Sequence, residues 1–317
     1  MLFRLFCALL FMFSAYIPAA ANTLTVILPV PDDAHAVNAR ILGRYLQKHH
    51  PHKPEVIFRT IPGAASVVAA NYLYNIAPRD GSTIGVFYKN IPLVGAIGGS
   101  NVNFDPSGFT WLGSTADGRK DAVLLISRKN YDGTELIIGT DNVVLADPVR
   151  FIRESTGWNI RQVTGYKSNS EIRLAVERGE VDAIVNSMIG IKTTRPQWLQ
   201  PDSPFKIILQ FGNGRERHPE FSQVPTLSEI ISADKQDLLK IFETQFALLR
   251  PYVAPPNLSA EQSALLRKMF TAAVSDLEYV AETRKANIDV NLIDWREAEA
   301  IVRITTSAPR NLLERLR

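Results

Sequence analysis

TLTVILPVPDDAHAVNARILGRYLQKHH (23–50), followed by EVIFR (55–59), SVVAANYLYNI (66–76) and TIGVF (83–87), decides the fold of this chain. The apolar run 23–30 predicts a buried strand, and residues 34–50 carry apolar side chains on one helical face. A strand, a helix and a third strand are predicted in the same way at 55–59, 66–76 and 83–87. This alternation predicts an α/β protein with right-handed crossovers and mainly parallel sheets.

The same alternation continues along the chain. Further strands are predicted at 123–126, 136–138, 182–186 and 206–210, and helices at 148–155 and 171–178. Ser259 with Gln262 has the spacing of a capping box, and Asp294 with Glu297 repeats it, so each pair predicts a helix start. These C-terminal helices need a sheet against which to bury their apolar faces. We therefore expect the C-terminal segment to return to the first domain.

Composition and charge exclude several classes of protein. The 317 residues are 46% hydrophobic and 21% charged, with a formal net charge of +3. These values are typical of a globular protein and not of a disordered one. The small charge and the lack of a Lys/Arg-rich run argue against nucleic acid as a partner.

The first 21 residues read as a secretory signal peptide. Arg4 precedes an apolar stretch at 5–17, and Ala19-Ala20-Ala21 has the small residues of a cleavage site. The alternative is an uncleaved N-terminal anchor, but the stretch is short for a membrane span. Cleavage near Ala21 removes Cys7, the only cysteine. That excludes a disulfide framework, a zinc-thiolate site and a cysteine nucleophile, and it favours the bacterial periplasm as the location.

Three strand-to-helix loops have unusual compositions. The first is 29–35, in which Pro31, Asp32 and Asp33 precede Ala34, either as a helix cap or as a cleft edge. The second is 61–66, which has only small residues before a helix start, and the third is 165–170. A helix N-terminus with open N–H groups is a ready site for a carboxylate or phosphate, whereas a plain tight turn is the structural alternative.

Other chemistry is weakly supported. The histidines at 49, 50 and 52 surround Pro51 and are best explained as a solvated helix end. No metalloprotease, nucleophile-elbow or phosphate-loop motif occurs, so no catalytic residue, metal or cofactor is predicted. Asn186 and Ser187 follow a predicted strand and are candidates for a cleft, because ligands bind outside the carboxyl ends of such strands.

A dozen short motifs follow one another along the chain. They are IPGAAS (61–66), AANYL (69–73), APRDG (77–81), TIG (83–85), FD (104–105), WLGS (111–114), GYK (165–167), RLAVERGEVD (173–182), VPTL (224–227), RP (250–251), PP (255–256) and LR (266–267). In this order they resemble the substrate-binding proteins of tripartite tricarboxylate transporters (the TctC or Bug family). The resemblance implies a type II periplasmic-binding-protein fold, with two α/β lobes joined by two crossover segments and a ligand cleft between them. We expect lobe 1 to contain residues 22–123 and 245–317, and lobe 2 to contain 124–244.

The resemblance also implies a function. The protein would be a monomeric, non-enzymatic, periplasmic solute-binding protein that captures a small carboxylate or amino-acid-like ligand for transporter subunits or a sensor ectodomain. Backbone amides of the first two loops and contacts from the other lobe would hold the ligand. Carried over by position, and joined by the two strand-end candidates above, the ligand-binding residues are Pro31, Asp32, Asp33, Ala34, Ala64, Ala65, Ser66, Thr140, Asp141, Asn142, Tyr166, Lys167, Ser168, Asn186 and Ser187.

The first loop departs from the family pattern, which has glycines where this chain has Asp32 and Asp33. Two carboxylates would repel an incoming anion, by about 1 kcal/mol at 4 Å in bulk water. Three interpretations stay open: the side chains turn outward, the ligand carries a positive group, or binding has been lost. The last would leave a paralogue that serves as an interaction module. A periplasmic enzyme that uses Asp32 and Asp33 as an acid/base pair is the alternative from another class.

Overall fold

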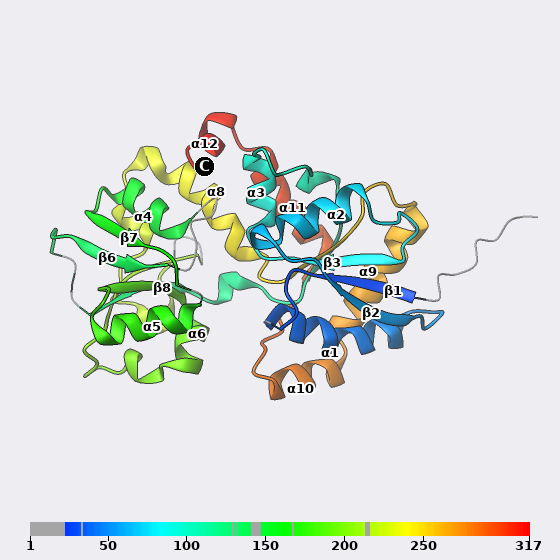
Figure 1. Ribbon diagram of the computed structural model, residues 1–317, viewed down its shortest axis with the longest axis horizontal. Coiled ribbons are helices and arrows are strands. Elements are labelled where there is room, and N and C mark those ends of the chain that lie inside the picture. The colour runs from blue at the N-terminus through cyan, green and yellow to red at the C-terminus, as the bar shows by residue number, and fades with distance from the viewer. Residues whose placement is uncertain are drawn as a thin grey trace, which may run out of the picture.

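The chain forms two α/β lobes that lie side by side (Figure 1). The computed structural model describes residues 23–32, 34–128, 130, 132–140, 147–166, 168–212 and 216–317. Each lobe is built around one sheet, and the two sheets share no strand. The predicted two-lobed α/β fold is therefore confirmed.

The sheet of lobe 1 has the strand order β11-β4-β10-β3-β1-β2. Its strands are β1 (Thr23–Leu28), β2 (Glu55–Thr60), β3 (Thr83–Val86), β4 (Thr110–Ser114), β10 (Pro251–Ala254) and β11 (Ile293–Asp294). β1 pairs in parallel with β2 and β3, whereas β10 is antiparallel to both β3 and β4. β11 adds a short antiparallel edge.

The sheet of lobe 2 has the order β7-β6-β8-β5-β9. Its strands are β5 (Val123–Ser127), β6 (Leu136–Gly139), β7 (Ile160–Val163), β8 (Ala183–Ser187) and β9 (Lys206–Phe211). β6 is parallel to β7 and β8, and β5 is antiparallel to β8 and β9.

Both sheets are mixed, so the prediction of mainly parallel sheets is wrong. The physical reason lies in the two places where the chain passes between lobes. β5 is the first strand after the chain enters lobe 2, and β10 is the first after it returns to lobe 1. Each of these two strands arrives from the other lobe and not through a strand-helix-strand crossover, so its direction is not required to match that of its neighbours. Each pairs antiparallel with both strands beside it.

Lobe 1 is covered by helices from both ends of the chain. They are α1 (Ala34–His49), α2 (Val67–Asn75), α3 (Ile91–Ile97), α9 (Ala260–Val274), α10 (Leu277–Lys285) and α11 (Trp295–Thr306). Leu266, Met269 and Phe270 of α9 share one core with Leu24 and Val26 of β1. Ser259 and Gln262 form the predicted capping box at the start of α9.

Lobe 2 carries α4 (Pro148–Thr156), α5 (Asn169–Arg178), α6 (Met188–Thr194) and α7 (Leu227–Ile230). α8 (Gln236–Ala247) runs from lobe 2 to lobe 1 at the junction, where α3 and α12 (Arg310–Glu314) meet it (Figure 1). Phe242 of α8 stacks on Phe151 of α4, with ring centroids 3.9 Å apart. Within the described residues, no helix has the length and apolar character that crossing a bilayer requires.

Candidate ligand cleft between the lobes

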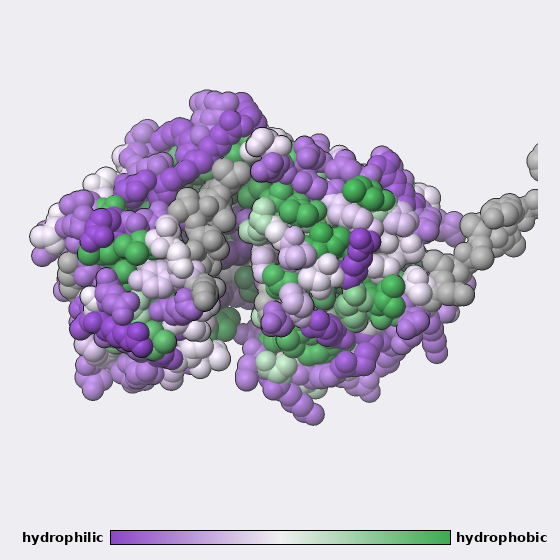
Figure 2. Space-filling view, in the orientation of Figure 1, coloured by the Kyte–Doolittle hydropathy of each residue, from purple (hydrophilic) through white to green (hydrophobic). Residues whose placement is uncertain are grey.

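A cavity of about 560 Å³ lies between the two lobes, and Figure 2 shows the groove that separates them on one face. Its wall comes from both lobes and from the junction. Its lining includes Ala34, His35, Lys89, Asp121, Gly139, Thr140, Asp147, Asn169, Val185, Asn186, Ser187, Phe246, Leu249, Arg250 and Asp289. This is the size of cavity that small-molecule sites in proteins commonly have.

Three helices of lobe 2 begin at this cavity. α4 starts at Asp147, whose Oδ1 accepts a hydrogen bond from the Arg150 amide at 2.8 Å. Ser187 precedes α6, and its Oγ accepts from the Gly190 amide at 3.0 Å. α5 starts after Ser168. Helix N-termini carry partial positive charge, so this wall of the cavity favours an anion.

The N-terminus of α6 is filled by groups of the protein itself. Asp121 Oδ1, from the segment that enters lobe 2, accepts from the Ile189 amide at 3.0 Å. The Met188 amide donates to the Ala122 carbonyl at 2.8 Å. With Gly190 bound to Ser187 Oγ, the first three amides of α6 are all paired. An incoming ligand therefore finds no open backbone donor there.

The N-terminus of α5 is open by comparison. Ser168 Oγ accepts from the Glu171 amide at 3.4 Å, and the Ser168 carbonyl accepts from Ile172 at 3.2 Å. The amides of Asn169 and Ser170 have no partner within the part of the chain that the structure describes. Of these residues, Asn169 lines the cavity.

Asn186 presents an unpaired donor at the cavity. Only 8% of the residue is exposed, and its Oδ1 accepts from the Ser187 amide at 2.8 Å. Its Nδ2 is buried and has no hydrogen-bond partner. Buried polar groups are nearly always hydrogen-bonded, so an unpaired amide nitrogen in a cavity wall indicates that a ligand or solvent supplies the acceptor.

Lys89 is a cation on the facing lobe. It follows β3, is half-buried, and its Nζ lies 4.2 Å from the centroid of the Phe246 ring. Crowding by protein atoms lowers the pKa of Lys89 to about 8, an effect that the Asp121 carboxylate partly opposes. No described residue forms an ion pair with its ammonium group. A partly desolvated, unpaired cation favours an anionic ligand, which would restore its lost interactions.

Asp121 brings negative charge to the same cavity. Burial raises the pKa of its carboxyl group, whereas hydrogen bonds from the Ile189 amide and the Ser187 hydroxyl oppose that rise. Asp147 is only 3% exposed, and its Oδ2 accepts from Gln162 Nε2 at 3.0 Å. The oxygens of both carboxylates thus already serve as acceptors for protein donors.

The junction closes the remaining side of the cavity. His35 Nε2 lies 3.3 Å from the Leu249 carbonyl oxygen, and its ring packs edge-on against Tyr88 with centroids 4.8 Å apart. Arg250 Nη1 donates to the Asp289 carbonyl at 3.1 Å. These contacts link the start of α1 to the segment through which the chain returns to lobe 1.

The structure brings four of the predicted site residues to the cavity, namely Ala34, Thr140, Asn186 and Ser187. Pro31, Asp32, Tyr166 and Ser168 are described but are not part of its wall. Asp32 is exposed, and Tyr166 lies behind the wall, 3.3 Å from where a Cβ on Gly139 would be. Asp33, Asp141, Asn142 and Lys167 lie outside the described residues.

The second loop, Ala64 to Ser66, also lies away from the cavity wall. All three residues have positive φ, at 46°, 47° and 78°, a backbone region that residues with a Cβ rarely adopt. Such strain persists only where the surroundings fix it. Here Ser66 is fully buried, and its Oγ accepts from the Tyr88 amide at 3.1 Å, which ties the loop to the residue next to Lys89.

Sequence reasoning missed Lys89, Asp121, Asp147 and Arg250. Lys89 had a usable signal, since it comes two residues after the predicted strand 83–87 and so lies at a strand's carboxyl end. Asp121, Asp147 and Arg250 lie on loops of no distinctive composition. Asp121 and Arg250 also contact residues that are far away in the sequence.

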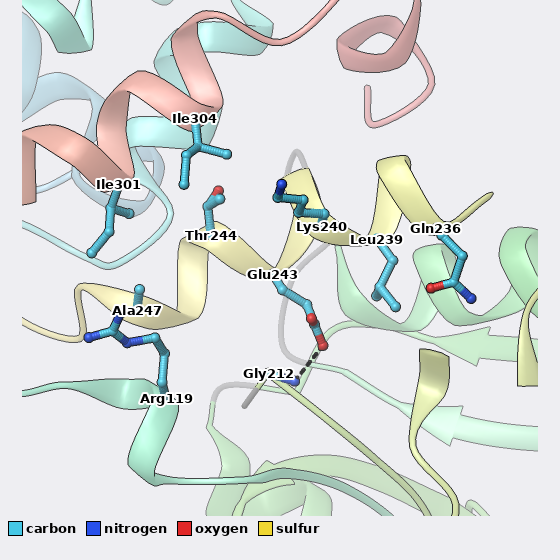
Figure 3. Close-up of a pocket in the computed structure, with 10 residues that line it drawn as sticks. All are labelled: Arg119, Gly212, Gln236, Leu239, Lys240, Glu243, Thr244, Ala247, Ile301 and Ile304. Carbon is cyan, nitrogen blue, oxygen red and sulfur yellow. Dashed lines mark hydrogen bonds between the residues drawn. The ribbon is translucent and has the colours of Figure 1, made fainter. Parts of the chain in front are cut away.

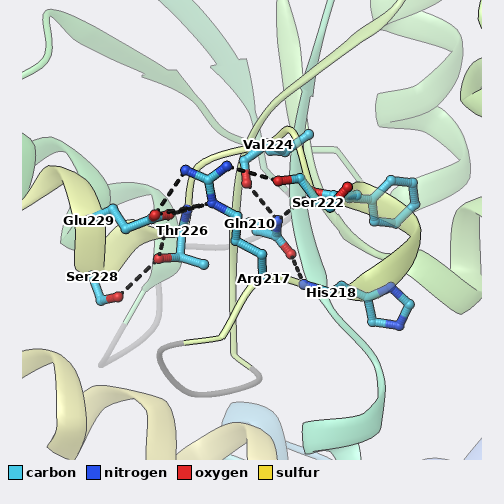
Figure 4. A network of polar contacts seen from close by, with 9 residues as sticks. Gln210, Arg217, His218, Ser222, Val224, Thr226, Ser228 and Glu229 are labelled. Atoms are coloured by element: carbon cyan, nitrogen blue, oxygen red, sulfur yellow. Dashed lines mark hydrogen bonds and ion pairs between the residues drawn. The ribbon is translucent and has the colours of Figure 1, made fainter.

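Two other features of the molecule are rich in polar groups but differ from the cleft. A second cavity, of about 490 Å³, lies between α8 and α11, where Glu243 accepts from the Gly212 amide at 2.9 Å (Figure 3). On lobe 2, Arg217 makes paired hydrogen bonds to Glu229, and the buried Gln210 bonds the main chain beside them (Figure 4). Among the described residues, no group of three or more His, Cys, Asp or Glu is arranged to hold a metal ion.

No protein-family model matches the sequence, and no curated protein matches it significantly. Similar solved structures cover nearly the whole chain. A TctC solute-binding protein from Polaromonas, without ligand, is 14% identical, with a TM-score of 0.67 over 93% of this chain and 98% of that one. MatC from Rhodopseudomonas palustris, with bound malate, is 16% identical, with a TM-score of 0.61 over 92% and 99%.

Rpa4515 of R. palustris, solved with adipate, is 15% identical, with a TM-score of 0.59 over 90% of this chain and 94% of that one. At these identities the likeness concerns the fold. The expected resemblance is thus confirmed at that level: the chain has the two-lobed fold of the TctC- and Bug-type periplasmic binding proteins.

Proposed function

We propose that this protein is a periplasmic solute-binding protein of the TctC or Bug type. It captures a small organic acid between its lobes, for a tripartite tricarboxylate-type transporter or for a sensor. The observation that carries the proposal is the inter-lobe cavity with unpaired hydrogen-bond donors on both sides, the Lys89 ammonium on lobe 1 and the Asn186 amide on lobe 2.

The bound acids of two similar structures support this proposal. MatC was solved with malate and Rpa4515 with adipate, and both share this fold over most of their length. A carboxylate suits the donors described above, because charged acceptors form the strongest hydrogen bonds with ammonium and amide groups.

Binding would act by closing the lobes. A ligand that contacts both walls stabilises the closed arrangement by its additional contacts there, and this shifts the population towards closure. We propose that the lobes meet near residues 123/124 and 244/245. The first position falls at the start of β5, the first strand of lobe 2, and the second falls inside α8, which runs between the lobes.

Export is part of the same proposal. Residues 1–21 would be removed near Ala21, which leaves a mature chain without cysteine. Expression of the full-length sequence in a bacterium, followed by fractionation and intact mass measurement, tests this. A mature mass in the periplasmic fraction supports it, and a full-length chain retained in the membrane fraction contradicts it.

Thermal denaturation with a panel of acids tests the binding function. The panel contains malate, adipate, succinate, citrate, aspartate, glutamate and benzoate, each at 1 mM or above. A ligand at about 100 times its Kd stabilises the folded state by about 2.7 kcal/mol, which raises the midpoint by several degrees. No shift across the panel, together with no small molecule in mass spectra of the purified protein, would contradict the proposed function.

A further inference from the structure

We propose that Lys89 and Asn186, one from each lobe, are the side chains that grip the anionic group of the ligand, and that they select an organic acid without an ammonium group. This inference rests on the proposed function and names the residues and the ligand class behind it.

Lys89 and Asn186 are joined by a short series of contacts. Lys89 interacts electrostatically with Asp121, and Asp121 accepts from the Ser187 hydroxyl, next to Asn186 in the chain. All four residues line the same cavity. The donors therefore face one space from opposite lobes, so a single anion can satisfy both when the lobes close.

The donors are available, whereas the buried acceptors are engaged. Asn186 Nδ2 has no partner, and no described residue pairs with the Lys89 ammonium. Asp121 accepts from Ile189 and Ser187, and Asp147 accepts from Arg150 and Gln162. A ligand ammonium beside Asp121 or Asp147 would thus compete with hydrogen bonds that the protein already makes, while a ligand carboxylate completes ones that it lacks. The third carboxylate of the wall, Asp289, is exposed to solvent.

Malate and aspartate provide a matched test of the ligand class, since they differ by a hydroxyl in place of an ammonium group. Isothermal titration at pH 7 is expected to give an affinity for malate at least tenfold above that for aspartate. The pair adipate and 2-aminoadipate repeats the comparison at a longer spacing. Tighter binding of both amino acids would overturn the inferred class and leave the proposed function intact.

Substitutions test the two residues. Lys89→Met removes the ammonium group but keeps an unbranched, apolar side chain that can still pack against the Phe246 ring, and is expected to weaken binding of the best acid at least tenfold. Lys240→Met, at an exposed position of α8, removes the same charge away from the cavity and serves as the control. Asn186→Asp keeps the oxygen that accepts from Ser187 but replaces the donor by a charge, and is expected to cost more than tenfold.

The pH dependence separates direct contact from a structural role. With the Lys89 pKa near 8, about a tenth of the lysine is protonated at pH 9, so affinity should fall about tenfold between pH 7 and pH 9. Arginine stays charged in this range, so Lys89→Arg should retain binding and lose that dependence. The other ionisable groups in the cavity wall are His35, Asp121, Asp147, Arg250 and Asp289, and they are common to both proteins.

The outcomes distinguish the two proposals. If the unaltered protein binds no acid of the panel, the proposed function fails and this inference fails with it. If it binds an acid and Lys89→Met or Asn186→Asp binds that acid equally well, only the inference is overturned. Circular dichroism and the melting midpoint of each variant without ligand establish that a loss of binding is not a loss of folding.

Discussion

The two cavities of this molecule are similar in volume and different in chemistry. The one between α8 and α11 is about 490 Å³, and the one between the lobes is about 560 Å³. In the α8–α11 cavity, Glu243 bonds the Gly212 amide (Figure 3). Arg119 pairs there with Asp117 and Glu297, and Lys240 is exposed to solvent. In the inter-lobe cavity, the Lys89 ammonium and the Asn186 amide are left without such partners.

This difference shows that volume alone does not mark a binding site. Wherever the protein satisfies its own polar groups, a ligand gains only the displacement of water and the contact of its apolar surface. Where buried donors are unpaired, a ligand that supplies the acceptor removes a penalty of about 1–3 kcal/mol for each group. We therefore expect ligand-dependent effects to follow the inter-lobe cavity and not the α8–α11 cavity.

Filling each cavity should give the largest contrast. Val185→Trp places a large ring in the wall between the lobes and should abolish the rise in melting midpoint caused by the best acid. Thr244→Trp fills the α8–α11 cavity and should leave that rise unchanged. Thermal denaturation of both variants with and without ligand measures the effect. A normal shift in Val185→Trp, or a lost shift in Thr244→Trp, would reverse the comparison.

Removing one negative charge from each cavity should give an intermediate contrast. Asp121→Asn keeps an oxygen to accept from the Ile189 amide but no longer repels an anion. At about 1 kcal/mol for a charge at 4 Å in water, affinity for the acid should rise about fivefold. Asp117→Asn makes the same change of charge beside the α8–α11 cavity, and titration should show no rise there.

Asp121 also affects stability with a defined sign. Because burial raises its pKa in the folded state, the folded protein binds this proton more tightly than the unfolded chain does. The contribution to stability therefore falls as pH rises through the ordinary range of an aspartate. Melting midpoints across pH 3.5 to 7 should lose that component in Asp121→Asn, and an unchanged profile would contradict the assignment.

The smallest effect is expected at the Arg217–Glu229 pair, which makes several polar contacts (Figure 4). Neither residue lines either cavity. Hydrogen bonds from Arg217 and the Thr226 amide lower the pKa of Glu229 to about 2. Its contribution is thus present above pH 4.5 and lost as pH falls towards 2. Since the pair is exposed, Glu229→Gln should change the acid limb of the melting profile slightly and the affinity for the acid not at all.

Much of the fold could be predicted because many segments show a clear period. Residues 23–30, 34–50 and 55–59 were predicted within a few residues of β1, α1 and β2. β4 and β10 were missed, because β4 carries Gly113 and two hydroxyl residues in place of a clear apolar run and β10 is only four residues long. Pro251 and the prolines at 255 and 256 also argue locally against a strand. Both strands form through pairing with segments that are distant in the sequence. A local pattern of apolar and polar residues does not reveal such pairing.

The site was predicted in part for the same reason. Asn186 and Ser187 were found because they follow a recognisable strand, and the same rule applied to β3 would have found Lys89. Asp121 could not be found in this way. Its partner, the Ile189 amide, lies 68 residues further along the chain, at the start of a helix in the other lobe. Hydrogen bonds from distant residues such as Asp121 determine which helix N-terminus keeps unpaired amides. Those hydrogen bonds depend in turn on how the two lobes are joined.

The C-terminal helix α12 offers a position for an optical reporter. Leu313 and Leu316 pack into the core that includes α8 and residues of α3, so the last turn of the chain lies on the junction of the lobes (Figure 1). None of the described residues from 310 to 317 belongs to the wall of the inter-lobe cavity. Since the mature chain is expected to lack cysteine, a single cysteine introduced there could carry one fluorophore. Its emission would follow movement of the lobes in real time without obstructing the ligand.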